Sequence, residues 1–164
     1  MPSTNQEKLC ALFKVMGKTL TMDTFEDRLE VQKIPYLAQV YGINLNYVFS
    51  WYLRGPYSKQ VTKDGYDMEK LSNVSVPTDM ENDEKVREFK RIIEPHMNDP
   101  TWLEIAASVV YLREKQYKDK LLDQIIGYLV EDMTCRYKNF DETSVRCVME
   151  ELATNGLLKQ SVNI

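Results

Sequence analysis

Hydrophobic residues recur at the spacing of a helix along most of the chain. The first set occupies positions i, i+3, i+4 and i+7, which form one helix face: Leu9, Leu12, Phe13 and Met16. We expect this helix to begin in a capping box in which Thr4 and Glu7 each satisfy a backbone N–H group. Gly17 is expected to end it, because glycine tolerates the left-handed conformation that follows many helices.

A second helix is predicted to run from a cap at Asp23 or Thr24 to an end at Gly42. Pro35 lies inside it, where a proline removes one backbone hydrogen bond and crowds the preceding turn, at a cost of about 3 kcal/mol. We therefore predict a kink or a local break near Val31.

The pattern changes from Leu45 to Leu53, where large side chains alternate and aromatic residues dominate. This alternation predicts a strand that is covered on both faces. One strand cannot satisfy its own backbone groups, so it needs a partner. The candidates for that partner are residues 73–77 and the C-terminal tail.

A turn and a further helix are expected after the strand. Gly55-Pro56 is predicted to form a tight turn, and Ser58 is predicted to be the N-cap of the next helix. This helix is expected to extend over residues 59–71, although Gly65 is unfavourable in its middle.

The rest of the chain combines an acidic stretch with helical patterns. Residues 78–84 contain four acids and are expected to form a linker or an exposed loop. Asp99 before Pro100 is a strong helix start. Asp141 is expected to cap the last helix, which ends at Asn155 before a Gly-Leu-Leu sequence. Winged-helix units and helical hairpins both close in this way, so this ending does not separate them.

These patterns predict a mainly α fold with about seven helices. We describe it as a winged-helix-like helical domain with one or two short strands near residues 45–54. A single domain over residues 1–164 is expected. The acidic loop allows a subdivision into residues 1–76, which carry the unusual motifs, and an all-helical half over residues 85–164. A chain of this length buries about 70% of its unfolded surface, so it needs no disulfide or metal to form a core.

Composition excludes several classes of protein. The net charge of −4 and the pI of about 5.2 argue against a protein that coats nucleic acid, since such proteins neutralise phosphates. The three cysteines are odd in number, lack CxxC spacing and are expected to be buried: Cys10, Cys135 and Cys147. No signal-peptide pattern and no apolar run of roughly 20 residues is found, so we expect a cytoplasmic protein outside the membrane.

The chain lacks the residues that most enzyme sites need. His96 is the only histidine, which argues against a histidine-based triad or a multi-histidine metal site, and we expect it in an exposed turn. Acidic pairs such as Asp64 and Asp67 are expected to be solvated helix surface. No phosphate-binding glycine motif is present. We therefore expect no enzyme activity, no metal and no cofactor.

Polar residues in the middle of the second helix are the best candidates for a site. Gln32 and Tyr36 are four residues apart, and Lys33 lies beside them. The short connection after Gly42 should send the strand back along this helix and bring its far end to the same region. We predict that five residues gather there and bind a partner: Gln32, Lys33, Tyr36, Arg54 and Tyr57. Two alternatives stay open: Gln32 bonds the backbone freed by Pro35, or the group only pins the turn to the helix.

The stretch around this segment resembles the YwgA-like small prokaryotic proteins and, more distantly, the SocA-like antitoxin (Panacea) domain. The resemblance covers residues 5–75 and rests on these positions: Arg28, Gln32, Lys33, Tyr36, Leu37, Tyr47, Phe49, Gly55, Pro56, Tyr57 and Ser58. Pro35 departs from the family pattern, which has an apolar helix former there. The resemblance implies a mainly helical, winged-helix-like fold with a small β element. It also implies roles in toxin neutralisation, phage-related loci or regulation, and it supplies no catalytic residues.

Three functional hypotheses follow. The first is a non-catalytic, antitoxin-like interaction or regulatory module with a protein partner, either a toxin or a regulatory protein. The alternative is a winged-helix nucleic-acid-binding regulator, which the basic residues Lys59, Lys63 and Lys70 favour and the acids between them oppose. A hydrolase or transferase is least favoured. The sequence does not indicate an oligomeric state.

Overall fold

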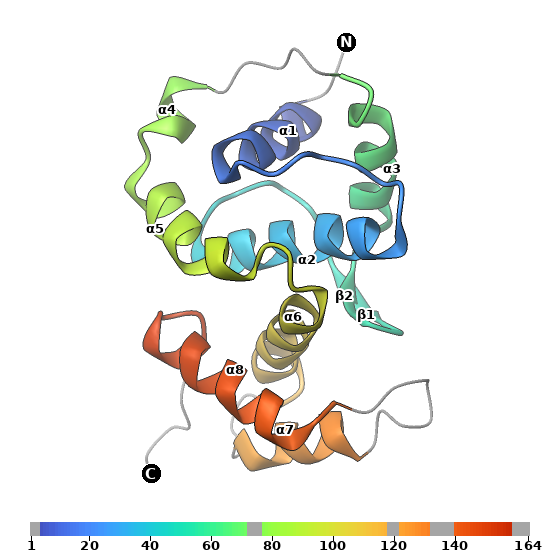
Figure 1. Cartoon of the computed structure of the whole chain (residues 1–164), viewed down its shortest axis with the longest axis vertical. Helices are drawn as coiled ribbons and strands as arrows, with labels where there is room; N and C mark the ends of the chain where they lie inside the picture. The colour runs from blue at the N-terminus through green and yellow to red at the C-terminus, as the bar shows by residue number, and fades with distance from the viewer. Residues whose placement is uncertain (1–3, 72–76, 118–121, 132–139, 159–164) are drawn as a thin grey trace.

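Helices and one small hairpin make up the computed structural model, which describes residues 4–71, 77–117, 122–131 and 140–158 (Figure 1). The elements are α1 (Thr4–Met16), α2 (Phe25–Tyr41), β1 (Ser50–Tyr52), β2 (Gly55–Tyr57), α3 (Lys59–Met68), α4 (Thr78–Glu81), α5 (Glu84–Ile93), the 3-10 helix η1 (Glu94–His96), α6 (Pro100–Lys115), α7 (Leu122–Val130) and α8 (Glu142–Thr154). The predicted mainly helical fold with short strands near residues 45–54 is confirmed.

Helix α2 crosses the middle of the molecule in Figure 1, with α1, α3 and α4 above it, α5 beside its left end, and α6, α7 and α8 below it. Thr24 is its N-cap and forms a capping box with Asp27, while Gly42 ends it with φ 110°. The helix continues without interruption through Pro35, so the predicted local break near Val31 is wrong. All ten residues 29–38 are buried, and this packing on every side offsets the cost of the proline.

The predicted strand is much shorter than expected. Asn46 adopts a positive φ of 64°, which interrupts an extended chain. The side-chain amide of Gln39 then takes the place of a neighbouring strand. It accepts from the Tyr47 N–H at 2.8 Å and donates to the Tyr47 carbonyl at 3.0 Å. Both backbone groups of Tyr47 are therefore satisfied without a ladder.

Strand β1 pairs with the adjacent β2, which corrects the prediction that its partner was residues 73–77 or the C-terminal tail. Residues 73–76 and 159–164 lie outside the described residues. The hairpin turn is formed by Leu53 and Arg54, so the prediction of a turn at Gly55-Pro56 is wrong by two residues. Gly55 instead pairs with Tyr52 as the first residue of β2. Ser58 is the N-cap of α3, as predicted, and its hydroxyl accepts from the Val61 N–H at 3.3 Å.

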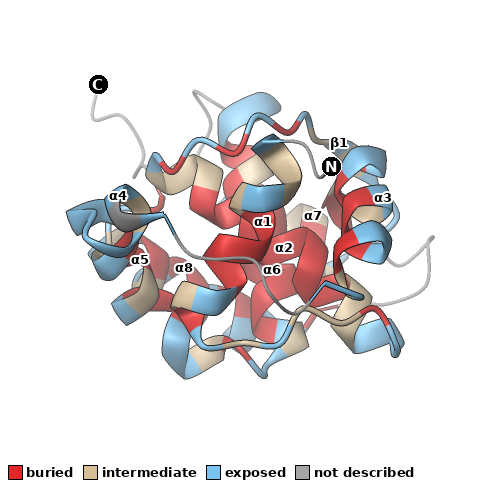
Figure 2. Cartoon of the chain, turned by 90° about the horizontal axis from the view of Figure 1, so that it is seen from above, coloured by how far each residue is buried: buried red, intermediate tan, exposed pale blue. Residues whose placement is uncertain are grey.

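One hydrophobic core joins the two halves of the sequence. Helix α2 of the first half packs on α6 of the second, and a single cluster of buried residues includes Leu9 and Leu158. Figure 2 shows the buried residues concentrated around α1, α2 and α6. Residues 78–81, predicted as a linker or loop, form the short helix α4. Its Asp79 and Glu81 are exposed.

Three predictions about single residues need correction. Cys147 is exposed on α8, whereas Cys10 is buried as predicted and Cys135 lies outside the described residues. His96 is half-buried, because its ring stacks on Trp102 with centroids 3.8 Å apart and it pairs with a glutamate of α8. Asp64 is buried rather than solvated, since its carboxylate accepts from the Tyr47 hydroxyl at 2.7 Å.

Among the helices that the structure describes, none combines the length and the apolar character needed to cross a membrane.

Candidate functional site

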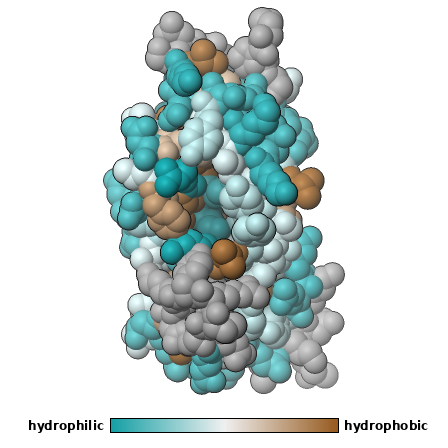
Figure 3. All heavy atoms as spheres, turned by 90° about the vertical axis from the view of Figure 1, so that its right-hand side faces the viewer, coloured by the Kyte–Doolittle hydropathy of each residue, from teal (hydrophilic) through white to brown (hydrophobic). Residues whose placement is uncertain are grey.

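A pocket of about 270 Å³ opens between α2, the β1–β2 hairpin and the start of α3. Its lining consists of Phe25, Arg28, Leu29, Gln32, Lys33, Tyr52, Leu53, Arg54, Gly55, Tyr57 and Thr62. Figure 3 shows a hollow on this face of the molecule, with hydrophobic side chains beside it. Four of the five predicted site residues line this one pocket. The exception is Tyr36.

Gln32 holds the first turn of α3 against α2. Its side-chain amide donates to the Ser58 carbonyl at 2.8 Å and accepts from the Ser58 N–H at 2.9 Å. The same nitrogen donates to the Thr62 hydroxyl at 2.7 Å, and that hydroxyl donates to the Tyr57 hydroxyl at 2.9 Å. Gln32 thus bonds the backbone of Ser58, and the pocket has a fixed wall. Gln32 therefore has the structural role that the sequence left open as an alternative, because it attaches the segment after the hairpin to α2.

Lys33 is a buried cation at the base of the pocket, with only 3% of the residue exposed. Its ammonium group donates to the Pro56 carbonyl at 2.8 Å, which ties β2 to α2. Burial lowers the pKa of Lys33 to about 7 because it disfavours the charged form. The Glu104 carboxylate raises this pKa and the Arg54 guanidinium lowers it further, but burial has the largest effect.

Arg54 connects the hairpin turn to two helices. Its Nη1 lies 3.3 Å from Oε2 of Glu104, a residue of α6 that is buried. Its guanidinium also lies over the Phe25 ring, 4.3 Å from the centroid. Because 33% of the Arg54 side chain remains exposed, this cation faces both the protein interior and the pocket opening.

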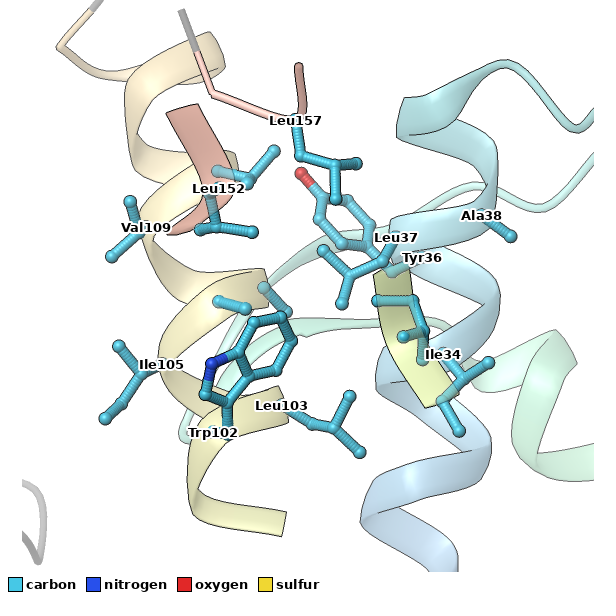
Figure 4. Close-up of a cluster of buried hydrophobic side chains, with 14 of the residues drawn as sticks. Ile34, Tyr36, Leu37, Ala38, Trp102, Leu103, Ile105, Val109, Leu152 and Leu157 are labelled. Carbon is cyan, nitrogen blue, oxygen red and sulfur yellow. The ribbon is translucent and has the colours of Figure 1, made fainter. Parts of the chain in front are cut away.

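Tyr36 lies outside the pocket, which corrects its place in the predicted cluster. It packs edge-on against Phe49 and beside Tyr111 of α6, and Figure 4 shows its side chain in the core between α2 and α6. Its hydroxyl is buried and has no hydrogen-bond partner among the described residues, and burial raises its pKa. Because an α-helix has about 3.6 residues per turn, a residue four positions further along does not point in quite the same direction as the first. On a helix buried all round, this rotation directs Gln32 and Tyr36 to different elements.

Sequence reasoning missed three residues that shape the site. Phe25 and Leu53 form part of its rim, and both are large apolar side chains about half exposed. Glu104 is 50 positions from Arg54, so no local pattern joins them. The sequence contains one indication of its role. Glu104 is an acid between the apolar residues of α6, and an acid in such a position is expected to form a buried ion pair.

The arrangement is suited to binding. Three cations line the pocket, and none of the lining residues described above is an acid, a cysteine or a histidine. The chain that the structure describes contains no group of three or more histidine, cysteine, aspartate or glutamate residues that could hold a metal ion. The pocket therefore offers a hydrophobic rim, cationic groups and hydrogen-bond donors, with no paired nucleophile and base in its lining.

Comparison of the chain with protein-family models, with curated proteins and with solved structures gives no match.

Proposed function

We propose that this chain is a non-catalytic, antitoxin-like interaction or regulatory module. It binds a protein partner, a toxin or a regulatory protein, through the pocket and its apolar rim. One observation carries the proposal: three large side chains about half exposed surround a pocket whose walls are fixed by hydrogen bonds. Phe25, Tyr52 and Leu53 are 45%, 54% and 52% exposed. We place this interaction in the cytoplasm, as the sequence led us to expect.

The composition of this face supports the proposal. Tyrosine and arginine are over-represented among the residues that carry most of the energy of protein interfaces. Here Tyr52 stacks on Tyr57 with ring centroids 5.3 Å apart, and Arg54 lies over Phe25. These contacts already restrain the side chains in the free protein, which lowers the entropy lost when a partner binds.

Nucleic acid is the less favoured partner. Ten consecutive residues of α2, the helix before the hairpin, are buried, so α2 lacks an outer face to place in a groove. Helix α3 exposes Lys59 and Lys63, and Lys70 is exposed just after the helix ends, but Lys63 pairs with the exposed Asp67 at 2.9 Å. Tight duplex binding at physiological salt in a gel-shift titration would favour the nucleic-acid alternative instead.

A capture experiment tests the proposed function. The immobilised full chain is compared with Leu53→Asp in a lysate of its native host, and the retained proteins are identified by mass spectrometry. Leu71→Asp is the matched control, because Leu71 is 44% exposed and is not among the residues that line this pocket. We expect a partner that the wild type and Leu71→Asp retain and Leu53→Asp loses, with similar thermal stability for all three. Retention of the same proteins by Leu53→Asp would contradict the proposal.

A further inference from the structure

We propose that the pocket receives an acidic side chain from an extended segment of the partner, next to an aliphatic or aromatic residue. The carboxylate lies among Arg28, Lys33 and Arg54, and the apolar neighbour packs on Phe25 and Leu53. This inference rests on the proposed function and specifies the chemistry of the partner.

The charge of the pocket is opposite to that of the whole chain. The protein carries a net charge of −4, yet the described residues that line the pocket include three basic side chains and no acid. Glu104, which is buried, lies against Nη1 of Arg54 and offsets part of this positive charge. The three basic groups in the lining favour an anion and disfavour a cationic segment.

The two arginines have the geometry to bind a carboxylate. Nη1 of Arg28 donates to the Met22 carbonyl at 3.0 Å and to the Asp23 carbonyl at 3.4 Å, which fixes the guanidinium through one of its three nitrogens. Arg54 is held by Glu104 through Nη1 and is partly exposed. A guanidinium carries five N–H donors in a rigid plane and forms paired bonds with carboxylates, so both side chains are anchored and still suited to an anion.

The size and rim of the pocket select an extended segment. A volume of about 270 Å³ accommodates one acidic side chain and part of a neighbour, and it is too small for a folded element. The apolar side chains of Phe25 and Leu53 stand at the opening, where a flanking aliphatic or aromatic residue would cover them.

Lys33 adds a dependence on pH. The charged groups that act on it are Glu104 from α6 and Arg54 from the hairpin turn, while the Pro56 carbonyl accepts a hydrogen bond from its ammonium group. A bound carboxylate favours the charged form of Lys33, so binding at pH 8 takes up a proton. Affinity for the acidic segment therefore falls as pH rises above about 7, where the free protein loses this charge.

A displayed library of random heptapeptides, joined to the carrier at both ends, tests the inference on the full chain. With no free terminal carboxylate, any acid must come from a side chain. We expect enrichment of aspartate or glutamate next to a large apolar residue. If the enriched peptides contain no acid and do not bind the Leu53→Asp variant, this inference is overturned and the proposed function is left intact. The absence of any enriched peptide would count against both.

Matched peptides then test the role of the arginines. The enriched peptide and its asparagine or glutamine counterpart are compared by calorimetry at pH 7 and pH 9. We expect the acidic peptide to bind about tenfold tighter at pH 7. The difference in affinity between the two peptides should be smaller at pH 9, and smaller in the variants Arg28→Gln and Arg54→Gln. Arg146→Gln, which alters an exposed arginine of α8, should keep it. Arg28→Gln leaves the Arg54–Glu104 pair in place, so it remains informative if Arg54→Gln is unstable. Equal binding of both peptides by the wild type would overturn the inference.

Discussion

Gln32 and Lys33 are adjacent in the sequence and have different effects on the pocket. Gln32 satisfies both backbone groups of Ser58, as a neighbouring strand would. Lys33 brings a cation into the interior, where it makes one hydrogen bond to the Pro56 carbonyl. The first residue therefore stabilises the fold, whereas the second reduces stability in its charged form and gives the pocket its charge.

Replacing Gln32 should reveal its structural role. In Gln32→Leu, the N–H of the buried Ser58 loses its partner, whereas the Ser58 carbonyl still accepts from the Thr62 N–H at 3.3 Å. An unsatisfied buried group costs about 1–3 kcal/mol. We expect a loss of about 1–3 kcal/mol in the free energy of unfolding, measured by urea denaturation. Gln60→Leu is the control, since Gln60 is exposed and bonds only within α3; it should change stability little. Similar effects for the two variants would contradict this role.

Lys33 should make the stability of the protein depend on pH. The folded protein releases this proton above a pH of about 7, whereas the unfolded chain keeps it up to about 10.5. Between these values the unfolded state binds more protons, so the free energy of unfolding rises with pH. We expect it to rise relative to Lys33→Met by about 1 kcal/mol per pH unit between pH 7 and 9, measured by urea denaturation. Parallel pH profiles for the two proteins would contradict the lowered pKa of the buried Lys33.

At the scale of the elements, the helices followed from the sequence, whereas the length and the pairing of the strand did not. The cap residues Thr24, Asp99 and Asp141 and the apolar spacing are local features, and the structure has the corresponding helices. The strand is shorter than predicted because Asn46 turns the chain and Gln39 binds the Tyr47 backbone from another element. The hydrophobic pattern within one segment does not show which side chains of other elements form hydrogen bonds with its backbone.

The contact between the hairpin and α6 can be tested at Gly55. It has φ 98°, and a Cβ there would lie 2.5 Å from the Ser108 hydroxyl oxygen of α6. Gly17 also has a positive φ, 73°, with nothing near its missing Cβ. We expect Gly55→Ala to lower the melting temperature clearly more than Gly17→Ala, because only the first adds a collision to the backbone strain.

A second substitution separates these two contributions. Ser108→Ala removes the hydroxyl that the new Cβ would meet, so it should recover part of the loss in Gly55→Ala and leave the backbone strain. Equal losses for Gly55→Ala and Gly17→Ala would show that the hairpin does not pack closely on α6.

At the scale of the molecule, the site was predicted in part. The short connection after α2 correctly placed Arg54 and Tyr57 near Gln32 and Lys33, because a strand joined by few residues must return along its helix. Glu104 could not be placed, since its position depends on how α6 packs on α2. Tyr36 was misplaced because the sequence does not show that α2 is buried on every side.

The shared core predicts that both halves unfold together. The chain has two tryptophans, Trp51 in residues 1–76 and Trp102 in residues 85–164. Trp102→Phe leaves only Trp51 as a fluorescent probe, and Trp51→Phe leaves only Trp102. Each variant is unfolded in urea and followed both by tryptophan fluorescence and by circular dichroism. Because the two probes are compared within one variant, any change in its overall stability affects both equally. We expect the same urea midpoint from both probes in each variant. Separate midpoints would show that the halves are independent domains.

Site-specific photo-crosslinking tests the central claim, that the partner binds at the hairpin pocket. A benzoylphenylalanine is placed at position 53, on the pocket rim, or at position 71, which is similarly exposed and is not part of the pocket lining. After irradiation in the native host, we expect a discrete covalent adduct with one protein from position 53 and none with that protein from position 71. No adduct at position 53, or the same adduct from both positions, would contradict it.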